Sequence, residues 1–345
     1  MTPELQGLRE VSARLGSDPL LVQGGGGNAS LKEGGILHVK SSGTWMSDAL
    51  KRDIFVSLDL AGVRKGVKAG EEDFSSLVLP SAQGDGRPSI ETALHAIMPH
   101  AVVIHAHAVN SICTTLLPSA VERLTQKLGG IRWAIVPYAK PGADLARAIQ
   151  DVLEADAPDV VFMSNHGVVA GGASAREVEE RLRDVESRLS FDQTVSSQPA
   201  VQADRPDVAG YRWHDDAGLG ALAFDPSRAQ KLCRRALVPD QVVYLGGPAV
   251  WSETVEDLSD IRAEWLRSRG VEPRLVFVSG LGALVHEDVG SGGMSMIFLL
   301  GEIAHRLPIT VVPSMLSVED ELKLLNWDAE KYRQALDAQR GSAGN

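Results

Sequence analysis

Residues 88–107, PSIETALHAIMPHAVVIHAH, combine a clear local structure with a candidate chemical site. A proline lies at each end of a segment that we expect to be a helix over 89–98. The β-branched residues that follow predict a strand over 101–109. Because alternate residues of a strand project from the same face, His105 and His107 are expected to point the same way and to reach one metal ion.

A His-x-His pair also fits two polar residues on a solvated strand face, so a further ligand is needed. A third imidazole, His166, lies in the turn 164–167, between strands expected at 159–163 and 168–170. Three neutral imidazoles leave a fourth coordination position open, as a catalytic zinc site requires. His166 taken alone also fits an ordinary turn residue, and both interpretations remain open at this point.

Glu91 precedes His105 by 14 residues and lies in the first turn of the expected helix. A carboxylate there ordinarily complements the positive end of the helix dipole. If the helix packs beside the His-x-His strand, Glu91 is instead a candidate general acid or base. His95 follows one turn later, and we expect it to hydrogen-bond near the site rather than to bind the metal.

Two short bends are rich in glycine and serine, at residues 24–30 and 41–43. Such bends present backbone N–H groups and hydroxyls to an anion, although most of them are simply tight turns. Neither bend has the glycine spacing of a dinucleotide-binding or P-loop fingerprint.

The 345 residues are 44% hydrophobic and carry a formal net charge of −11, which indicates a folded, soluble α/β protein. Without a basic half, no nucleic-acid partner is expected. Cys113 and Cys233 stand alone, which excludes a disulfide framework. Early charges break any signal peptide, and no apolar run approaches the roughly 20 residues of a membrane span. We therefore expect a cytoplasmic protein without a membrane partner.

The pattern of the chain changes near residue 195, where periodic segments give way to Ser, Gln, Pro and Asp. We expect an N-terminal catalytic domain over 1–195, a linker over 196–216 and a smaller C-terminal α/β unit over 217–345. We expect a helix of about 18 residues starting near 174 and buried strands at 241–245 and 275–278. A further strand is expected at 309–312, with helices at 293–305 and 318–338.

Five motifs occur in order: Gly-Gly-Asn-Ala-Ser, Lys-Ser-Ser-Gly, Pro-Ser-Ile-Glu-x-x-x-His, His-Ala-His and Asn-His-Gly. Over about residues 5–195 this set resembles the class II aldolase/adducin family. It looks closest to the aldolase part of fused rhamnulose-1-phosphate aldolase/short-chain dehydrogenase proteins. The resemblance implies a three-layer core with a central, mostly antiparallel sheet flanked by helices. The chain ends where a dehydrogenase would begin, so no oxidoreductase activity is expected.

The resemblance also implies roles for individual residues. It makes Glu91 the catalytic acid/base. The implied ligands of a zinc ion, or of another divalent metal, are His105, His107 and His166. The implied substrate-phosphate residues are Gly27, Asn28, Ser42, Gly43 and Ser89. Ile90 departs from the pattern, because it replaces a serine hydroxyl that binds phosphate in the short aldolases.

The activity implied is reversible cleavage of a ketose 1-phosphate to dihydroxyacetone phosphate and an aldehyde. A decarboxylase or dehydratase using the same metal-stabilised enolate is an alternative, with a phosphorylated sugar or keto acid as substrate. Glu91 argues against the 4-epimerases, which carry an aspartate there. A non-catalytic adducin-like binding protein is a third possibility, although such members typically lack the metal histidines. Family members are commonly tetramers, so a homo-oligomer is expected.

Overall fold

The computed structural model describes residues 2–80, 86–192, 205–325 and 327. The chain divides into two compact units, the first formed by residues 1–115 and 119–190, and the second by 116–118 and 191–345. No helix in the described ranges is long and apolar enough to cross a membrane.

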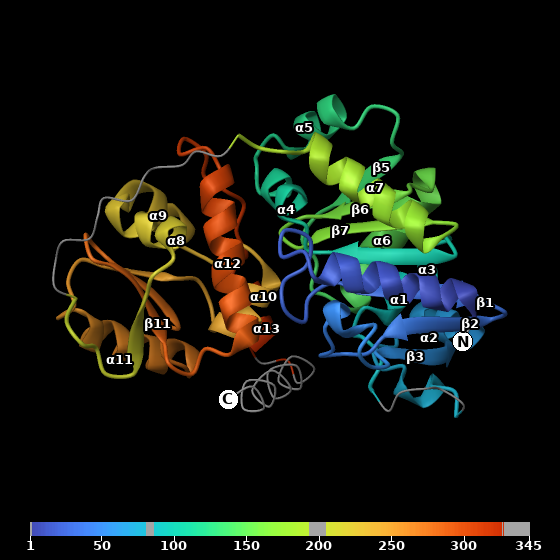
Figure 1. The fold of residues 1–345 in the computed structure, drawn as a ribbon, viewed down its shortest axis with the longest axis horizontal. Coiled ribbons are helices and arrows are strands. Elements are labelled where there is room, and N and C mark those ends of the chain that lie inside the picture. Colours follow the sequence, from blue (N-terminus) through green and yellow to red (C-terminus); the bar gives the residue numbers. More distant parts are fainter. Residues whose placement is uncertain (1, 81–85, 193–204, 326, 328–345) are drawn as a thin grey trace. The chain divides into compact units, whose positions relative to one another are not determined.

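The first unit is built on a seven-stranded sheet (Figure 1). Neighbouring strands are antiparallel throughout, except for the parallel pair β5 and β6. Across the sheet the strands are β3 (Phe55–Asp59), β2 (Ile36–Lys40), β1 (Asn28–Glu33), β4 (Val102–Ala106), β7 (Gly167–Gly172), β6 (Val160–Met163) and β5 (Trp133–Val136).

Helices cover both faces of this sheet (Figure 1). Ile104 packs in one core cluster with residues of α1 and α7, whereas its strand neighbour Val103 packs in another with α3 and α6. This alternation confirms the predicted three-layer core. The helices are α1 (Pro3–Gly16), α2 (Leu60–Ala69), α3 (Thr92–Ile97), α4 (Val109–Thr115), α5 (Ala120–Lys127), α6 (Ala143–Asp156) and α7 (Ala175–Arg188), with 3-10 turns at Met46–Asp48 and Ser75–Leu77.

Local sequence explains where these helices begin and end. The Ser174 side chain accepts a hydrogen bond from the Glu177 N–H and starts α7. Helix α3 ends one residue earlier than predicted, because Met98 precedes Pro99 and leaves the helical conformation with a ψ of 130°. Its first helical residue is Thr92, so Glu91 precedes the helix instead of lying within its first turn.

The second unit contains a four-stranded sheet in which β9 and β10 are parallel and the other pairs antiparallel. Its strands, in order, are β8 (Tyr211–His214), β11 (Gly282–His286), β10 (Leu275–Val278) and β9 (Val250–Ser252). Its helices are α8 (Ala217–Gly220), α9 (Pro226–Leu232), α10 (Pro239–Leu245), α11 (Leu258–Arg269), α12 (Ser291–Arg306) and α13 (Val318–Leu325), with a 3-10 turn at Ala221–Phe224.

Two secondary-structure expectations for this unit are wrong. Residues 241–245 are not a strand but part of α10, which begins at Pro239 and ends at Gly246 in the left-handed conformation. Residues 309–312 form no strand, because the Val311 N–H bonds to the Pro308 carbonyl in a turn. Within the expected linker, 211–214 is strand β8, while 193–204 lies outside the described residues. Of the helix expected at 318–338, residues 328–338 also lie outside them.

Candidate metal centre

The three histidines singled out in the sequence lie together at one end of the central sheet. His105 is in β4, His107 follows that strand, and His166 lies in the turn that joins β6 to β7. Strands β4 and β7 pair antiparallel, with His105 opposite Val169, so this turn falls beside the end of β4. The turn itself depends on Asn165, whose φ of 60° lies in the left-handed region that asparagine tolerates.

The cluster has the spacing of a metal site. One ring nitrogen from each histidine lies within 4.8 Å of the others, and all three residues are buried. The ring centroids are 4.8 to 5.1 Å apart in edge-on arrangements. Three converging imidazole nitrogens are the ligand set of a catalytic zinc ion with an open coordination position.

His105 shows most directly that a cation fits here. Its Nδ1 lies 3.1 Å from the Val168 carbonyl, which only accepts, so Nδ1 carries the proton and Nε2 presents a lone pair. Within the described part of the chain, the fully buried Nε2 has no hydrogen-bond partner. Leaving a buried polar atom unsatisfied costs about 1–3 kcal/mol. A metal ion bound by Nε2 removes that cost, and the second-nitrogen bond to a carbonyl is typical of ligating histidines.

The Glu91 carboxylate lies against the same cluster. Its Oε1 is 3.7 Å from Nε2 of His105 and 3.7 Å from Nε2 of His166. That oxygen is buried and has no hydrogen-bond partner in the described ranges. The structure thus brings the predicted acid/base and the predicted ligands into one site.

The glycine-rich bend packs directly on the histidines. A Cβ on Gly26 would lie 2.6 Å from His107 Nδ1 and 2.8 Å from its Cε1, closer than real Cβ contacts. Gly27 has a φ of 67°, and a Cβ there would lie 3.1 Å from the His105 carbonyl oxygen. The bend therefore fixes the space in which the imidazoles lie. No sequence pattern indicates that Gly26, rather than its neighbours, lies against His107.

The predicted phosphate residues border the histidine cluster. Asn28 pairs with His105 across β1 and β4. The Ser89 hydroxyl oxygen accepts hydrogen bonds from Asn28 Nδ2 and from the Glu91 N–H. With both lone pairs occupied, the Ser89 hydroxyl has its proton left to donate to an anion.

The second bend, residues 41–44, lies beside the segment that carries Ser89. The Ser42 N–H donates to the Arg87 carbonyl at 2.9 Å, and Ser41 forms an isolated bridge with Pro88. Gly43 has a φ of 71°, which lets the chain turn back at this point. The bend thus places Ser42 and Gly43 next to the Ser89 segment.

Lys40 is a charged residue of this region that the sequence reasoning missed. It is only 2% exposed, and its Nζ donates to the Thr44 carbonyl at 2.7 Å and to the Ser41 carbonyl at 3.4 Å. The ammonium therefore lies under the 41–44 bend. Its only sequence signal was its place in the Lys-Ser-Ser-Gly motif, because a lysine at a strand end is ordinarily a solvated cation.

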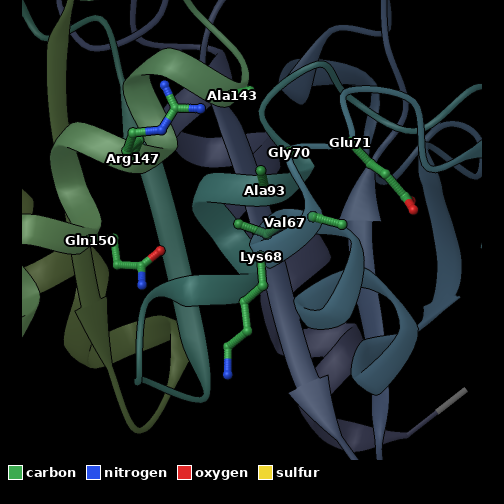
Figure 2. A pocket seen from close by; sticks show the side chains of 9 residues that line it. Val67, Lys68, Gly70, Glu71, Ala93, Ala143, Arg147 and Gln150 are labelled. Atoms are coloured by element: carbon green, nitrogen blue, oxygen red, sulfur yellow. The ribbon is translucent and has the colours of Figure 1, made fainter.

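A separate hollow of about 400 Å³ lies between α2, α3 and α6 (Figure 2). Its lining includes Lys68, Glu71, Ala93 and Arg147. Figure 2 shows the charged ends of Lys68, Glu71 and Arg147 pointing in three different directions. These side chains provide no converging set of donors, unlike the histidine cluster.

Comparison with known proteins places this site in a family context. Residues 6–190 match the family described as Class II Aldolase and Adducin N-terminal domain. Over 178 residues the chain is 32% identical to the uncharacterized oxidoreductase YuxG of Bacillus subtilis, a match that covers 47% of this chain and 25% of YuxG. The chain thus matches a quarter of the length of that relative.

Several solved structures are similar to the same part of the chain. The N-terminal class II aldolase domain of a conserved protein from Thermoplasma acidophilum is 25% identical, with a TM-score of 0.46, over 55% of this chain and 93% of that one. An L-fuculose 1-phosphate aldolase is 20% identical, with a TM-score of 0.41, over 55% and 84%. A sugar-phosphate aldolase from Thermotoga maritima is 17% identical, with a TM-score of 0.42, over 54% and 91%.

Proposed function

The chain belongs to the class II aldolase and adducin family, and from that premise we propose that it is a metal-dependent lyase. The reaction proposed is reversible cleavage of a ketose 1-phosphate to dihydroxyacetone phosphate and an aldehyde. The observation that carries the proposal is the buried cluster of three histidines with the Glu91 carboxylate 3.7 Å from two of them.

His105, His107 and His166 are the proposed metal ligands. A zinc ion, or another divalent ion, held by them would supply Lewis acidity toward negative charge on the substrate oxygens. The remaining work falls to groups of the chain itself. Removing bulk water from this buried site strengthens each of their electrostatic interactions.

Glu91 is the proposed acid/base. Its Oε1 lacks a hydrogen-bond partner in the described ranges, so it is free to take a proton from substrate or to return one. Glu91 would transfer this proton at the substrate carbon that gains or loses its bond to the aldehyde. A positioned general base typically contributes about 10²–10⁴-fold in rate.

The phosphate is proposed to lie among Gly27, Asn28, Ser42, Gly43 and Ser89. The Ser89 oxygen already accepts two hydrogen bonds, so its hydroxyl proton would be donated to the phosphate. The buried Lys40 ammonium adds positive charge under the same bend. Ile90 offers no hydroxyl, so backbone N–H groups and Ser89 provide the donors on that side.

All residues named in this proposal lie in the first unit, within the catalytic domain proposed for residues 1–195. Residues 217–345 have no part in the proposed chemistry. We further propose a cytoplasmic homo-oligomer, to be tested by light scattering of the purified protein.

The test is a screen of ketose 1-phosphates for metal-dependent release of dihydroxyacetone phosphate. Glu91→Gln should keep the metal and lower kcat by about 10²–10⁴-fold. His107→Ala should lose stoichiometric zinc, while the matched control His214→Ala, in the second unit, should retain it. Release of CO₂ or water from the substrate in place of aldol cleavage would replace the aldolase with the decarboxylase or dehydratase. Absence of bound metal would overturn both and favour a binding protein.

A further inference from the structure

His95 is a polar residue at the centre of the layer between α3 and the sheet. It is fully buried, and it follows Glu91 by one helical turn. Its Nδ1 lies 2.8 Å from the Ser30 hydroxyl on β1. Its other ring nitrogen, Nε2, has no hydrogen-bond partner in the part of the chain that the structure describes. Burial holds the pKa of His95 well below its ordinary value, so the ring is neutral.

An imidazole at this position is costly for the fold. The orphaned Nε2 costs about 1–3 kcal/mol relative to a satisfied atom. The nearby Lys32, His105 and Lys40 all disfavour the protonated form of the ring, so its charge adds no stability either. Stability alone therefore does not account for a histidine here.

The contact between His95 and Ser30 links Glu91 to the metal ligands. Ser30 lies two residues from Asn28 on β1, and Asn28 pairs with His105 on β4. Glu91 precedes α3 and its side chain makes no capping bond, so the place of its carboxylate depends on where the helix rests on the sheet. The Ser30–His95 bond fixes that position one turn from Glu91.

The end of α3 is held separately, through main-chain carbonyls. Arg64 Nε donates to the Ala96 carbonyl at 3.0 Å, and Lys32 Nζ donates to the His100 carbonyl at 2.8 Å. The start of the turn at Glu91 is tied to β1 through Ser89, whose Oγ accepts from Asn28 Nδ2 and from the Glu91 N–H. The Ser30–His95 bond holds the other end of that turn. His95 is the polar side chain of α3 that contacts the sheet there.

We propose that Ser30 and His95 are a positioning pair that holds the Glu91 carboxylate against the histidine cluster. The inference rests on the proposed function, since it assigns the pair a role in the proton transfer by Glu91. Displacing a reacting group by about 1 Å costs on the order of 10²-fold in rate. The pair therefore lowers the stability of the fold but holds the Glu91 carboxylate in place.

The test combines activity with readouts that a purely structural role would not separate. The variants are His95→Leu, His95→Asn and the double variant Ser30→Ala/His95→Leu, in the 345-residue chain loaded with zinc. In the double variant both polar partners are replaced, so its melting temperature should equal or exceed that of the parent. Its zinc content should be unchanged, whereas kcat should fall about 10–100-fold with KM within about threefold. His95→Asn, which keeps a polar atom near Nδ1, should recover part of kcat.

Ser12→Ala is the matched control. Ser12 is fully buried in α1, and its Oγ also lacks a partner in the described ranges. Its replacement should leave both kcat and zinc content unchanged. Proton exchange of dihydroxyacetone phosphate with D₂O, followed by NMR, should fall with kcat in the His95 variants, because it reports the Glu91 step without cleavage.

Two results would overturn the positioning role: unchanged kcat and exchange in the double variant, or a loss of zinc and melting temperature in step with kcat. A parent protein that neither cleaves nor exchanges any substrate of the panel would overturn the proposed function instead. In that case the cobalt-loaded protein tests the positioning pair, because its visible absorption depends on the groups near the metal and needs no substrate. His95→Leu should alter that absorption in the same direction as Glu91→Gln, and an unaltered spectrum would overturn the pair.

Discussion

Gly26→Ala is a one-carbon change that we expect to weaken the proposed metal site. The added Cβ would lie 2.6 Å from His107 Nδ1, and reaching an ordinary contact of 3.4 Å requires a displacement of about 0.8 Å. Metal–ligand distances tolerate only about ±0.2 Å, so the displaced His107 ring would not meet an ion held by the other two histidines. Changes of this size around a ligand typically cost about 10–100-fold in metal affinity, or roughly 1.4–2.8 kcal/mol.

Competition with a chelator of known zinc affinity measures this loss directly. Gly7→Ala is the matched control: a Cβ there meets nothing within 4 Å, and alanine in the interior of α1 should stabilise the protein by about 0.5–1 kcal/mol. The control should bind zinc like the parent protein. If Gly26→Ala also binds zinc with parental affinity, His107 is not a ligand in the geometry described, and the reasoning fails.

Two further predictions concern stability. Glu186 accepts hydrogen bonds from the N–H groups of Asn110 and Ser111 and from the Ser111 hydroxyl. Glu186→Ala should therefore lower the free energy of unfolding, measured by urea titration, by about 2–4 kcal/mol. The control Asp184→Ala, at an exposed residue, should change it by under about 0.5 kcal/mol. Burial lowers the pKa of Lys32 from 10.5 to about 7, so between these values the unfolded chain binds a proton that the folded chain does not. The free energy of unfolding should therefore rise with pH across that window, and the rise should be smaller in Lys32→Met; an equal rise would contradict the assignment to Lys32.

Local patterns predicted those parts of the fold that local physics decides. Helix α7 has an N-cap serine and an apolar stripe, Val178, Leu182 and Val185, which meets the core over its whole length. The β-branched residues at 102–104 likewise predicted strand β4, which carries His105. Each pattern depends only on residues a few positions apart, so it can be recognised without knowledge of the tertiary structure.

The errors occur where burial erases the pattern. Every residue of α10 is buried, including its polar Asp240 and Gln241, so no amphipathic period distinguishes a short helix from a strand. Strand β8 has the opposite difficulty, because only Tyr211 of its four residues is buried and the segment resembles a polar connection. The caps at Pro239 and Gly246 were the information that favoured a helix for α10.

The site residues that sequence reasoning missed are those defined by contacts between distant segments. Gly26 matters because of the ring of His107, and Ser30 because of His95, 65 residues away. Neither relation has a spacing rule, because strand pairing and helix docking set it. A motif therefore identifies which residues carry chemistry, whereas the residues that hold them in place become visible only in the folded chain.

The charges near the histidine cluster and the 41–44 bend bear on how the proposed site would bind an anionic substrate. The Glu91 carboxyl group lies beside the histidine cluster, and the Lys40 amino group lies under the 41–44 bend. A divalent ion on the three histidines would add two positive charges, which complement a phosphate carrying about −1.5 to −2. The net charge of −11 on the whole chain has little effect on phosphate binding, because exposed charges more than about 10 Å away are screened at ordinary salt concentrations. In the proposed enzyme, a metal held by the three histidines would help to hold the phosphate and would supply Lewis acidity at the carbonyl, so substitution of one of these histidines is expected to weaken both functions.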